Sequence, residues 1–478
     1  MKHLTLLLAG LLMLSFFVAL YFNPIQNPVG LGSDGYEYWH LSTNILQKKQ
    51  FAYSGEQFYP LLKLKPFAKM GLVPNIIPCT TRAPGYPVIL SLARMLWDSP
   101  WAAIIINYLF YIGICIYGFL LGNLLISDLR WRWIYNFLLT FSPLYFTRWG
   151  ISSDFCAGFL ATAFTYSFMR IMTLTQIPDP RQKHSGVTTR LPRYHLFWTS
   201  LLGLLACLTR SNLVLYIYPL IILGFLYGAM KKDKQIVINA LVLLVFIGVC
   251  LNAWMVRNQR LTDQRTLSTQ GGFVLYTVHL GYDHPKEHGL PADLFVQSLK
   301  SGKTINQTEA IVDQKLKNMV LAHYREHPFE AIKKEIDGIR TLFLFSYFDI
   351  SDTIVLAQKS FTKRMAFVNS SSSEYSSYTH QELLLRNILF QMSRLYKWVL
   401  MISFFAFPFI FLIKKGSFPS DSQAIMLFYV STLIGVLCTA LCTGAGGDRL
   451  RLPFNAFILI FVVFSWMMLA SRGPHKHL

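Results

Sequence analysis

Long hydrophobic runs, separated by polar segments, account for much of the chain. The runs cover residues 4–22, 101–126, 133–147, 155–175, 196–208, 213–230, 235–256, 398–413, 424–443 and 454–470. A helix needs about 20 apolar residues to cross the hydrocarbon core of a bilayer. The pattern predicts an all-α polytopic membrane protein with about 10–13 transmembrane helices. Two further stretches, 86–97 and 341–348, are candidates for re-entrant or interfacial segments.

The first run, 4–22, follows Met1-Lys2-His3 and has the length of a signal-peptide core or a membrane anchor. Cleavage of a signal peptide requires small residues at alternate positions near its end. That pattern is missing from residues 18–23, so we expect an uncleaved anchor.

The chain has two long polar segments, 23–100 and 257–397, and we predict three parts. Residues 1–256 would form an N-terminal transmembrane catalytic module that includes the outer loop 23–100. Residues 257–397 would form a small extracytoplasmic domain, and 398–478 the C-terminal transmembrane helices. Lys and Arg concentrate in short cytoplasmic loops of membrane proteins. With the lysine-rich loop 231–234 inside, both termini are cytoplasmic and both long segments lie outside.

The composition also indicates a membrane protein, but basic residues greatly outnumber acidic ones. Hydrophobic residues make up 53% and charged residues 14% of the chain, yet 44 Lys and Arg oppose 24 Asp and Glu. A basic excess is typical of cytoplasmic loops or of nucleic-acid binding, and the latter requires solvated basic runs with interleaved aromatic residues. Because the chain has no such run, we expect a lipid bilayer and no nucleic acid among its partners.

The acidic residues indicate where chemistry would take place. None lies in the middle of a hydrophobic run, whereas proton-coupled transporters place carboxylates at bilayer depth. Most fall on the predicted outer face, and those of the membrane-proximal outer segments are Asp34, Glu37, Glu56, Asp98, Asp154 and Asp448. We therefore expect any catalytic site on the outer face.

Asp34 stands shortly after the first run, between Gly32 and Gly35. Small neighbours allow a substrate to approach closely, and the aromatic rings that follow, Tyr36, Tyr38 and Trp39, can stack on a sugar ring or prenyl chain. An alternative interpretation is that Asp34 caps a helix beginning near Gly35. The two roles are compatible.

Further polar motifs fall on the same predicted face. The rigid turn of Arg82-Ala83-Pro84-Gly85-Tyr86-Pro87 places an arginine at the outer interface, where it can bind a lipid-linked phosphate or anchor the chain. The other motifs are Ser152-Ser153-Asp154, Leu204-Leu205-Ala206-Cys207-Leu208-Thr209-Arg210, Arg257-Asn258 and Arg449-Leu450-Arg451-Leu452-Pro453. Each motif is short, and their coincidence on one face is the stronger observation.

Together with Asp34-Gly35-Tyr36, these motifs resemble, in order and over most of the chain, the integral-membrane glycosyltransferases of the GT-C fold. The similarity is to the branch that contains protein O-mannosyltransferases and the lipid A aminoarabinose transferase. It implies GT-C membrane helices with extracytoplasmic loops and a small extracytoplasmic domain. It also implies inverting transfer of a sugar from a polyprenyl-phosphate donor to a hydroxyl acceptor on a glycolipid, protein or polysaccharide.

The resemblance also implies roles for individual residues. Asp34 would act as the general base on the acceptor hydroxyl, and Asp154 would orient the acceptor or nearby cations. The candidates to hold the departing lipid phosphate are Arg82, Arg449, Arg451 and Arg257. Substrate-lining positions would be Tyr36, Glu37, Tyr86 and Asn258. Part of the basic excess on the outer face then serves an anionic donor.

Metal binding has two weak candidates. His279, His284 and His288 are of a zinc-ligand type, but an intervening proline and a glycine interrupt regular helical spacing and favour solvated loop histidines. Asp34 with Glu37 is a candidate pair for a divalent ion, although a third carboxylate is missing nearby. We expect that no cofactor is required, with a divalent metal ion as the alternative.

Two other functions remain open from the sequence. A lipid-linked saccharide transporter or flippase would use the same outer arginines, but it predicts charged or broken helices at mid-bilayer. An O-antigen polymerase or ligase would place its key Arg and His in the large outer loop. Asp34 in the first loop favours the transferase, which we expect in a bacterial inner (plasma) membrane with an extracytoplasmic active site.

Overall fold

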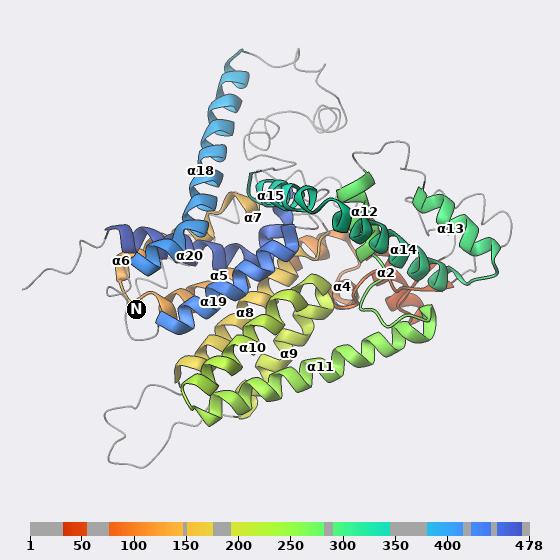
Figure 1. Ribbon diagram of the computed structural model, residues 1–478, viewed down its shortest axis with the longest axis horizontal. Coiled ribbons are helices and arrows are strands. Elements are labelled where there is room, and N and C mark those ends of the chain that lie inside the picture. Colours follow the sequence, from red (N-terminus) through yellow and green to blue (C-terminus); the bar gives the residue numbers. More distant parts are fainter. Residues whose placement is uncertain are drawn as a thin grey trace, which may run out of the picture.

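A computed structural model describes residues 32–54, 76–146, 151–174, 193–281, 290–344, 380–413, 422–440 and 447–470 of the chain. Within these ranges nearly all regular structure is helical, and the one sheet is a two-stranded ribbon. Figure 1 shows long helices running side by side through the body of the molecule, with shorter helices and the ribbon gathered at one end.

Seven described segments are long and apolar enough to cross a membrane. They belong to α5 (Pro100–Leu125), α8 (Asp154–Leu174), α10 (Val214–Met230), α11 (Lys234–Thr262), α18 (His380–Ile413), α19 (Ser422–Ala440) and α20 (Asn455–Ala470). The shorter helices between them are α4 (Gly85–Leu96), α6 (Leu129–Thr140), α7 (Pro143–Phe146) and α9 (Arg193–Thr209). The all-α polytopic class predicted from the sequence is confirmed.

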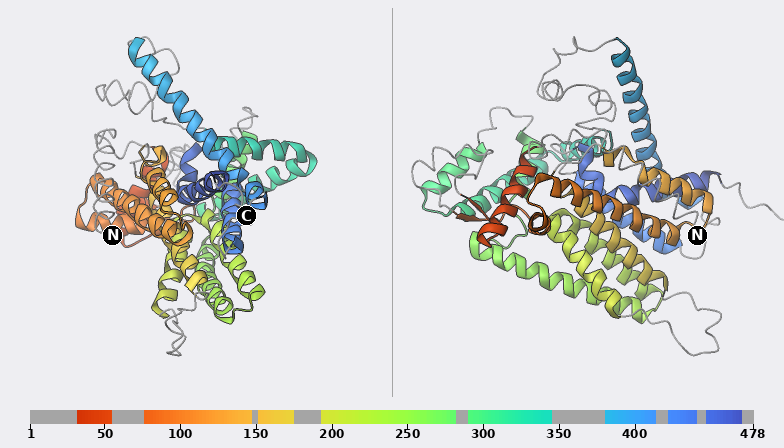
Figure 2. Two further views of the ribbon diagram at one scale, coloured as in Figure 1. Left: turned by 90° about the vertical axis from the view of Figure 1, so that its left-hand side faces the viewer. Right: turned by 180° about the vertical axis from the view of Figure 1, so that it is seen from behind.

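A second group of elements lies at one end of the long helices. It consists of α2 (Gly32–Lys48), β1 (Ala52–Ser54), β2 (Ile76–Pro78), α12 (Gly271–Tyr276), η2 (Thr277–Gly281), α13 (Leu290–Lys300) and α14 (Ile305–Glu326). The strands pair antiparallel, with Ala52 opposite Pro78. Seen from behind in Figure 2, α2 lies at the same end as α13 and α14. Beside this group, α15 (Pro328–Leu344) packs against the 3-10 segment η7 (Gly447–Phe454) and α19.

Several helices begin at residues that satisfy the free backbone amides of a helix N-terminus. Ser99 caps α5, and Asp128 and Asp233 cap α6 and α11 with their side-chain oxygens. Before α14, Thr304 and Gln307 form a reciprocal capping box. These local signals determine where the helices start.

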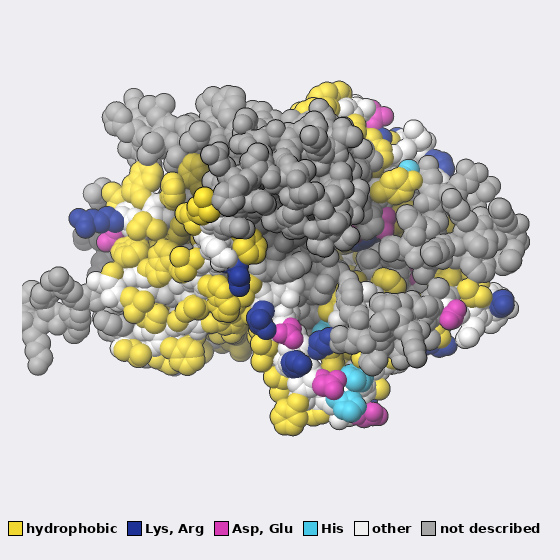
Figure 3. All heavy atoms as spheres, turned by 90° about the horizontal axis from the view of Figure 1, so that it is seen from above, with side chains coloured by type: hydrophobic (Ala, Val, Ile, Leu, Met, Phe, Trp, Pro, Cys, Tyr) yellow, Lys and Arg dark blue, Asp and Glu magenta, His cyan; other side chains and the backbone are white. Residues whose placement is uncertain are grey.

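The centre of the bundle is formed by α8 and α20, which bury most of their residues, whereas α5, α11 and α18 bury fewer than half of theirs. Aromatic stacking fills the interior, as between Tyr216 and Phe457 at 5.2 Å. The exposed helices carry large apolar side chains such as Leu109, Val249 and Phe409. In Figure 3, hydrophobic side chains cover much of the described surface on one side, while charged and His side chains gather on the other. This division is expected of a protein partly immersed in lipid.

The observed helices change several predicted boundaries. The run 133–147 divides into α6 and α7, and α18 begins at His380, well before the predicted start at 398. The stretch 86–97 forms the short helix α4, and α15 covers the start of 341–348. The predicted anchor 4–22 lies outside the described residues.

Gly85 lies where α4 meets α9. A Cβ atom added there would come within 2.8 Å of the Leu208 carbonyl oxygen and 2.6 Å of Thr209 Oγ1. Because backbone cannot move aside as easily as a side chain, we expect Gly85→Ala to lower the free energy of unfolding by about 1–3 kcal/mol. Gly271→Ala is the matched control, since nothing lies within 4 Å of its added Cβ. Thermal unfolding in detergent measures both variants, and equal midpoints would contradict the prediction.

Candidate functional site

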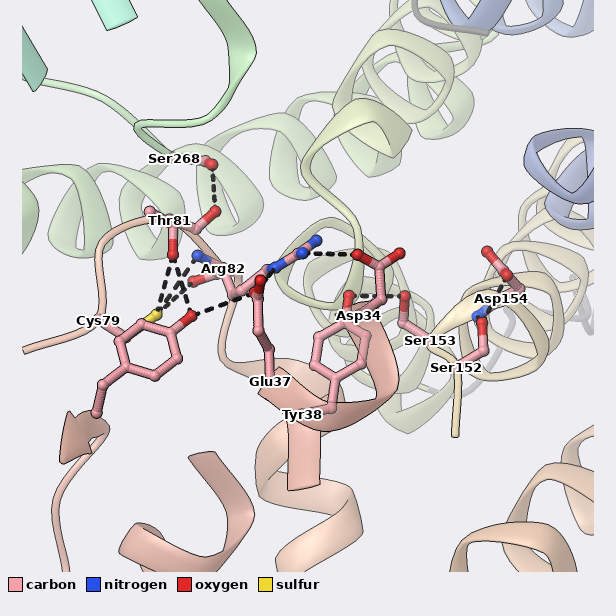
Figure 4. A network of polar contacts seen from close by, with 11 residues as sticks. Asp34, Glu37, Tyr38, Cys79, Thr81, Arg82, Ser152, Ser153, Asp154 and Ser268 are labelled. Carbon is pink, nitrogen blue, oxygen red and sulfur yellow. Dashed lines mark hydrogen bonds and ion pairs between the residues drawn. The ribbon is translucent and has the colours of Figure 1, made fainter. Parts of the chain in front are cut away.

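Arg82 forms the centre of a polar network beside α2 (Figure 4). Its Nη2 donates to Asp34 Oδ1 at 2.7 Å, and its Nε donates to Glu37 Oε2 at 2.6 Å. Asp34 and Glu37 occupy positions i and i+3 of α2, which places them on one face of the helix. One guanidinium therefore bridges two acidic residues of α2.

Asp34 lies within the first turn of α2, whose N-terminal end stabilises a carboxylate. The helix begins at Gly32, so Asp34 is not the cap that the alternative interpretation placed before Gly35. Its side chain is 24% exposed, against 12% for Arg82 and 18% for Glu37. Asp34 is therefore the most accessible of the three, as a group that exchanges a proton with substrate must be.

The charge of Arg82 is stabilised by its neighbours. Burial alone would lower the pKa of its guanidinium, but Tyr38, Asp34 and Glu37 outweigh burial and raise that pKa well above its ordinary value. The guanidinium carbon lies 5.5 Å from the centre of the Tyr38 ring. Burial also raises the pKa of Tyr38, so its hydroxyl stays neutral. At physiological pH one cation thus faces two acidic side chains.

A second layer of residues from the two-stranded ribbon supports this network. The Tyr53 hydroxyl lies 3.5 Å from Glu37 Oε2 and 3.1 Å from Thr81 Oγ1. The backbone amide of Arg82 donates to Cys79 Sγ at 3.4 Å. Burial raises the pKa of Tyr53 well above its ordinary value and also raises that of the Cys79 thiol. Both groups therefore act as neutral hydrogen-bonding partners.

The second outer motif joins the network through Tyr38. The Tyr38 hydroxyl lies 3.1 Å from Ser153 Oγ, which connects α2 to the start of α8. Asp154 forms an ion pair with Arg210, and Ser152 Oγ donates to the other Asp154 oxygen at 2.5 Å. Because the Asp154 side chain is only 3% exposed, it is placed to orient Arg210 rather than to meet a substrate directly.

The loop that carries Arg82 is held by the end of α11 and the segment after it. Consecutive carbonyl groups from Pro78 to Thr81 each accept a hydrogen bond from this part of the chain. Asn306 Nδ2, at the start of α14, donates to the Pro78 carbonyl, and Arg257 Nη1 donates to the Cys79 carbonyl. The Thr269 amide donates to the Thr80 carbonyl, and Ser268 Oγ donates to the Thr81 carbonyl. The bond from Ser268 to Thr81 is visible in Figure 4. Residues 257–306 therefore help to build the site.

Two sequence candidates belong to this supporting layer. Arg257 donates to the Cys79 carbonyl at 2.6 Å and to Asn258 Oδ1 at 2.8 Å. Asn258 is fully buried, and its Nδ2 donates to the carbonyls of Thr266 and Leu267. The structure brings Arg257 to the Arg82 loop and places Asn258 beneath the surface.

Arg451 has different surroundings from Arg82. Its side chain is 2% exposed, and its Nη1 donates to the Phe343 carbonyl at 3.2 Å. Its guanidinium also lies over the Phe343 ring, at the end of α15. The backbone of Arg449 belongs to η7, but its side chain lies outside the described residues.

The two tyrosine candidates lie at different depths. Tyr36 is 37% exposed beside Asp34 on α2, with its ring against His40 at 4.1 Å. Tyr86 is fully buried, its ring lies 5.0 Å from that of Tyr38, and its hydroxyl donates to Asn107 at 3.4 Å. Tyr36 is therefore open to a ligand, whereas Tyr86 supports Tyr38 from behind.

No group of three or more His, Cys, Asp or Glu residues that could hold a metal ion occurs in the described ranges. His279 is buried, and its Nδ1 lies 2.5 Å from the Tyr324 hydroxyl. His284 and His288 lie outside the described residues. Asp34 and Glu37, the other candidate pair, share Arg82 as their cation.

Sequence reasoning did not predict the contact between Tyr38 and Ser153, which connects the two motifs. Tyr38 follows Asp34 at i+4, a spacing that indicates a shared helix face and could have identified it. Ser153 is adjacent to Asp154 but faces Tyr38 from a distant part of the sequence. No local pattern indicates such a contact.

No protein-family model matches the sequence, and no curated protein matches it. Solved structures do resemble the fold. Archaeal oligosaccharyltransferase AglB from Archaeoglobus fulgidus, in complex with an inhibitory peptide and a dolichol-phosphate, aligns with a TM-score of 0.50 at 11% identity, over 96% of this chain and 50% of that chain. The apo form of the Archaeoglobus fulgidus oligosaccharyltransferase gives 0.50 at 12% identity over the same shares.

A third structure, ArnT from Cupriavidus metallidurans bound to undecaprenyl phosphate, aligns with a TM-score of 0.38 at 12% identity, over 92% of this chain and 78% of that chain. The likeness to the oligosaccharyltransferase shows the fold, and the GT-C fold predicted from the sequence is confirmed. The chain is an integral membrane protein that spans about half the length of the oligosaccharyltransferase chain it matches.

Proposed function

We propose that this membrane protein of GT-C fold is a glycosyltransferase that moves a sugar from a polyprenyl-phosphate donor to a hydroxyl acceptor. The observation that carries the proposal is the accessible Asp34 carboxylate, held by Arg82 at one end of the bundle. An accessible carboxylate in a fixed position is suited to accept a proton from an attacking hydroxyl. One oligosaccharyltransferase structure of this fold contains a dolichol-phosphate, which supports a lipid-phosphate donor for this chain.

In the proposed reaction the acceptor oxygen attacks the anomeric carbon as the bond from that carbon to the phosphate oxygen breaks. The acceptor proton passes to Asp34, and the electron pair of the broken bond leaves on the polyprenyl phosphate. Attack from the face opposite the leaving group inverts the anomeric carbon. The leaving phosphate needs no proton if nearby cations stabilise its charge.

Arg257 is the candidate that the structure favours for this phosphate. Its described partners, the Cys79 carbonyl and the Asn258 amide oxygen, are both neutral, so no carboxylate there cancels its charge. Arg82 shares its charge with Asp34 and Glu37, and its first role in the proposal is to orient Asp34. Arg449 and Arg451 stay candidates for the same phosphate.

We place the active site on the extracytoplasmic face of a bacterial inner (plasma) membrane, with both termini in the cytoplasm. The support is the distribution of basic residues, because α11 has its lysine-rich start, 231–234, at the end remote from Arg257. The acceptor would be a hydroxyl of a glycolipid, protein or polysaccharide. The proposed steps use no cofactor or metal ion.

The test is sugar transfer by the purified protein in liposomes. Sugars linked to dolichyl phosphate and to undecaprenyl phosphate serve as donors, and mass spectrometry of glycoconjugates from a strain lacking the protein identifies the acceptor. We expect release of free polyprenyl phosphate together with a new glycosidic bond. Movement of an intact lipid-linked sugar across the bilayer, without cleavage, would overturn the proposal and favour a flippase.

A further inference from the structure

Glu309 is a buried acidic residue of α14 that contacts the loop carrying Arg82. The Thr80 hydroxyl donates to Glu309 Oε2 at 3.1 Å. That hydroxyl also lies 3.2 Å from Asn306 Nδ2 and 3.3 Å from the Thr269 hydroxyl. Since the Thr80 carbonyl accepts from the Thr269 amide at 3.0 Å, the residue is held through both its backbone and its side chain.

The second carboxyl oxygen of Glu309 is buried and makes no hydrogen bond within the described part of the chain. The residue as a whole is 7% exposed. An ionised carboxylate here would leave one oxygen without a donor, at a high cost in a low-dielectric interior. A neutral carboxylic acid keeps the bond from Thr80, and burial of an uncharged polar group costs far less than burial of a charge.

The surroundings of Glu309 favour the neutral form. Burial, followed by the charges of Glu37 and Asp313, raises the pKa of Glu309 well above its ordinary value. Asp313 lies one turn further along α14 and accepts from the Gly272 and Phe273 amides at the start of α12. Both acidic neighbours oppose a negative charge on Glu309.

Three other titratable groups beside α14 are engaged elsewhere. On α11, Arg257 donates to a backbone carbonyl of the loop, and Asp263 accepts from a glutamine of α14. His279 of η2 bonds with Tyr324 near the far end of α14. Within the described ranges, therefore, no cation pairs with Glu309.

We propose that Glu309 is a positioning residue for Arg82. In its neutral form the carboxyl group holds Thr80, and through the loop it fixes the guanidinium between Asp34 and Glu37. Loss of the proton places an unpaired charge near Glu37 and loosens the loop. The inference rests on the proposed function only for its effect on transfer, because loosening of the loop needs no substrate.

Alkylation of Cys79 measures the loop directly. Its thiol is fully buried, so its reaction with a maleimide requires the loop to open. Relative to Glu309→Gln, which cannot ionise, we expect wild type to label equally at the acidic end of the pH range in which the protein is stable, and about tenfold faster at the alkaline end. Comparison at one pH cancels the ionisation of the thiol itself. Mass spectrometry of the Cys79 peptide distinguishes it from the other cysteines.

Glu326→Gln is the matched control, because it makes the same change at an exposed position of α14. We expect its labelling ratio to wild type to stay near one at both pH values. Glu309→Leu, which cannot accept from Thr80, should label faster than wild type at both. Equal pH dependence in wild type and Glu309→Gln would overturn the inference, since the carboxyl would then be a structural spacer only.

Transfer assays extend the test to function. The transfer rate of wild type, divided by that of Glu309→Gln, should fall about tenfold from the acidic to the alkaline end of the same pH range. If Asp34→Asn and Arg82→Ala leave transfer unchanged, the proposed function fails while the Cys79 result still stands. If those variants lose transfer but the ratio for Glu309→Gln stays constant, the positioning role fails alone.

Discussion

Asp34→Asn is expected to lower the rate of sugar transfer by about 100-fold to 10,000-fold. The amide has nearly the size of the carboxylate, but it cannot accept a proton from the acceptor hydroxyl. Its oxygen can still accept from Arg82, and Glu37 still holds the guanidinium, so the fold should persist. Single-turnover assays with a saturating polyprenyl-phosphate sugar measure the loss, and binding of dolichyl phosphate should be unchanged.

Glu37→Gln is the matched variant, because Glu37 binds the same guanidinium at 2.6 Å. If Asp34 serves only as a partner for Arg82, the two amide variants should lose transfer equally. We expect Glu37→Gln to retain much more transfer, since Glu37 is less accessible and hydrogen-bonds to Tyr53. Near wild-type transfer by Asp34→Asn would reject the general-base assignment.

The membrane helices could be predicted from the sequence because hydrophobicity over about 20 residues is a local property. Short motifs identify Asp34 and Arg82 as candidates, because a motif is likewise a local property of the sequence. The divided run 133–147 shows the limit, since its composition does not reveal the turn between α6 and α7.

The contacts of the site residues could not be predicted in the same way. Arg82 was assigned to a phosphate, yet it bridges Asp34 and Glu37 from a position 48 residues after Asp34. Tyr86 and Asn258 were expected to line the substrate site, yet both are fully buried. A motif indicates which chemistry a residue can perform, whereas tertiary packing decides whether its side chain faces substrate or supports a neighbour.

The hydrogen bonds from residues 257–306 to the loop that carries Arg82 could not be predicted either. The sequence predicts 257–397 as a separate small domain, and nothing in its composition connects it to Pro78 or Thr81. In the structure, donors from residues 257–306 bind successive carbonyls of that loop. Such bonds use backbone acceptors, which every residue carries, so the loop sequence contains no signal for them.

Arg82→Ala is expected to lower the free energy of unfolding by about 3–5 kcal/mol, because it removes the guanidinium that bridges two acidic side chains. Arg340→Ala is the matched control. Arg340 also pairs with an acidic residue, Asp337, but at 63% exposure, so its loss should cost at most about 1 kcal/mol. Thermal unfolding in detergent compares the two, and equal effects would show that the Arg82 bridge adds no more than a surface pair.

Arg82→Lys restores one charge but not the two-armed donor, so it should recover part of the stability and little of the transfer. Full recovery of transfer by lysine would show that Arg82 acts as a point charge and that its geometry does not orient Asp34.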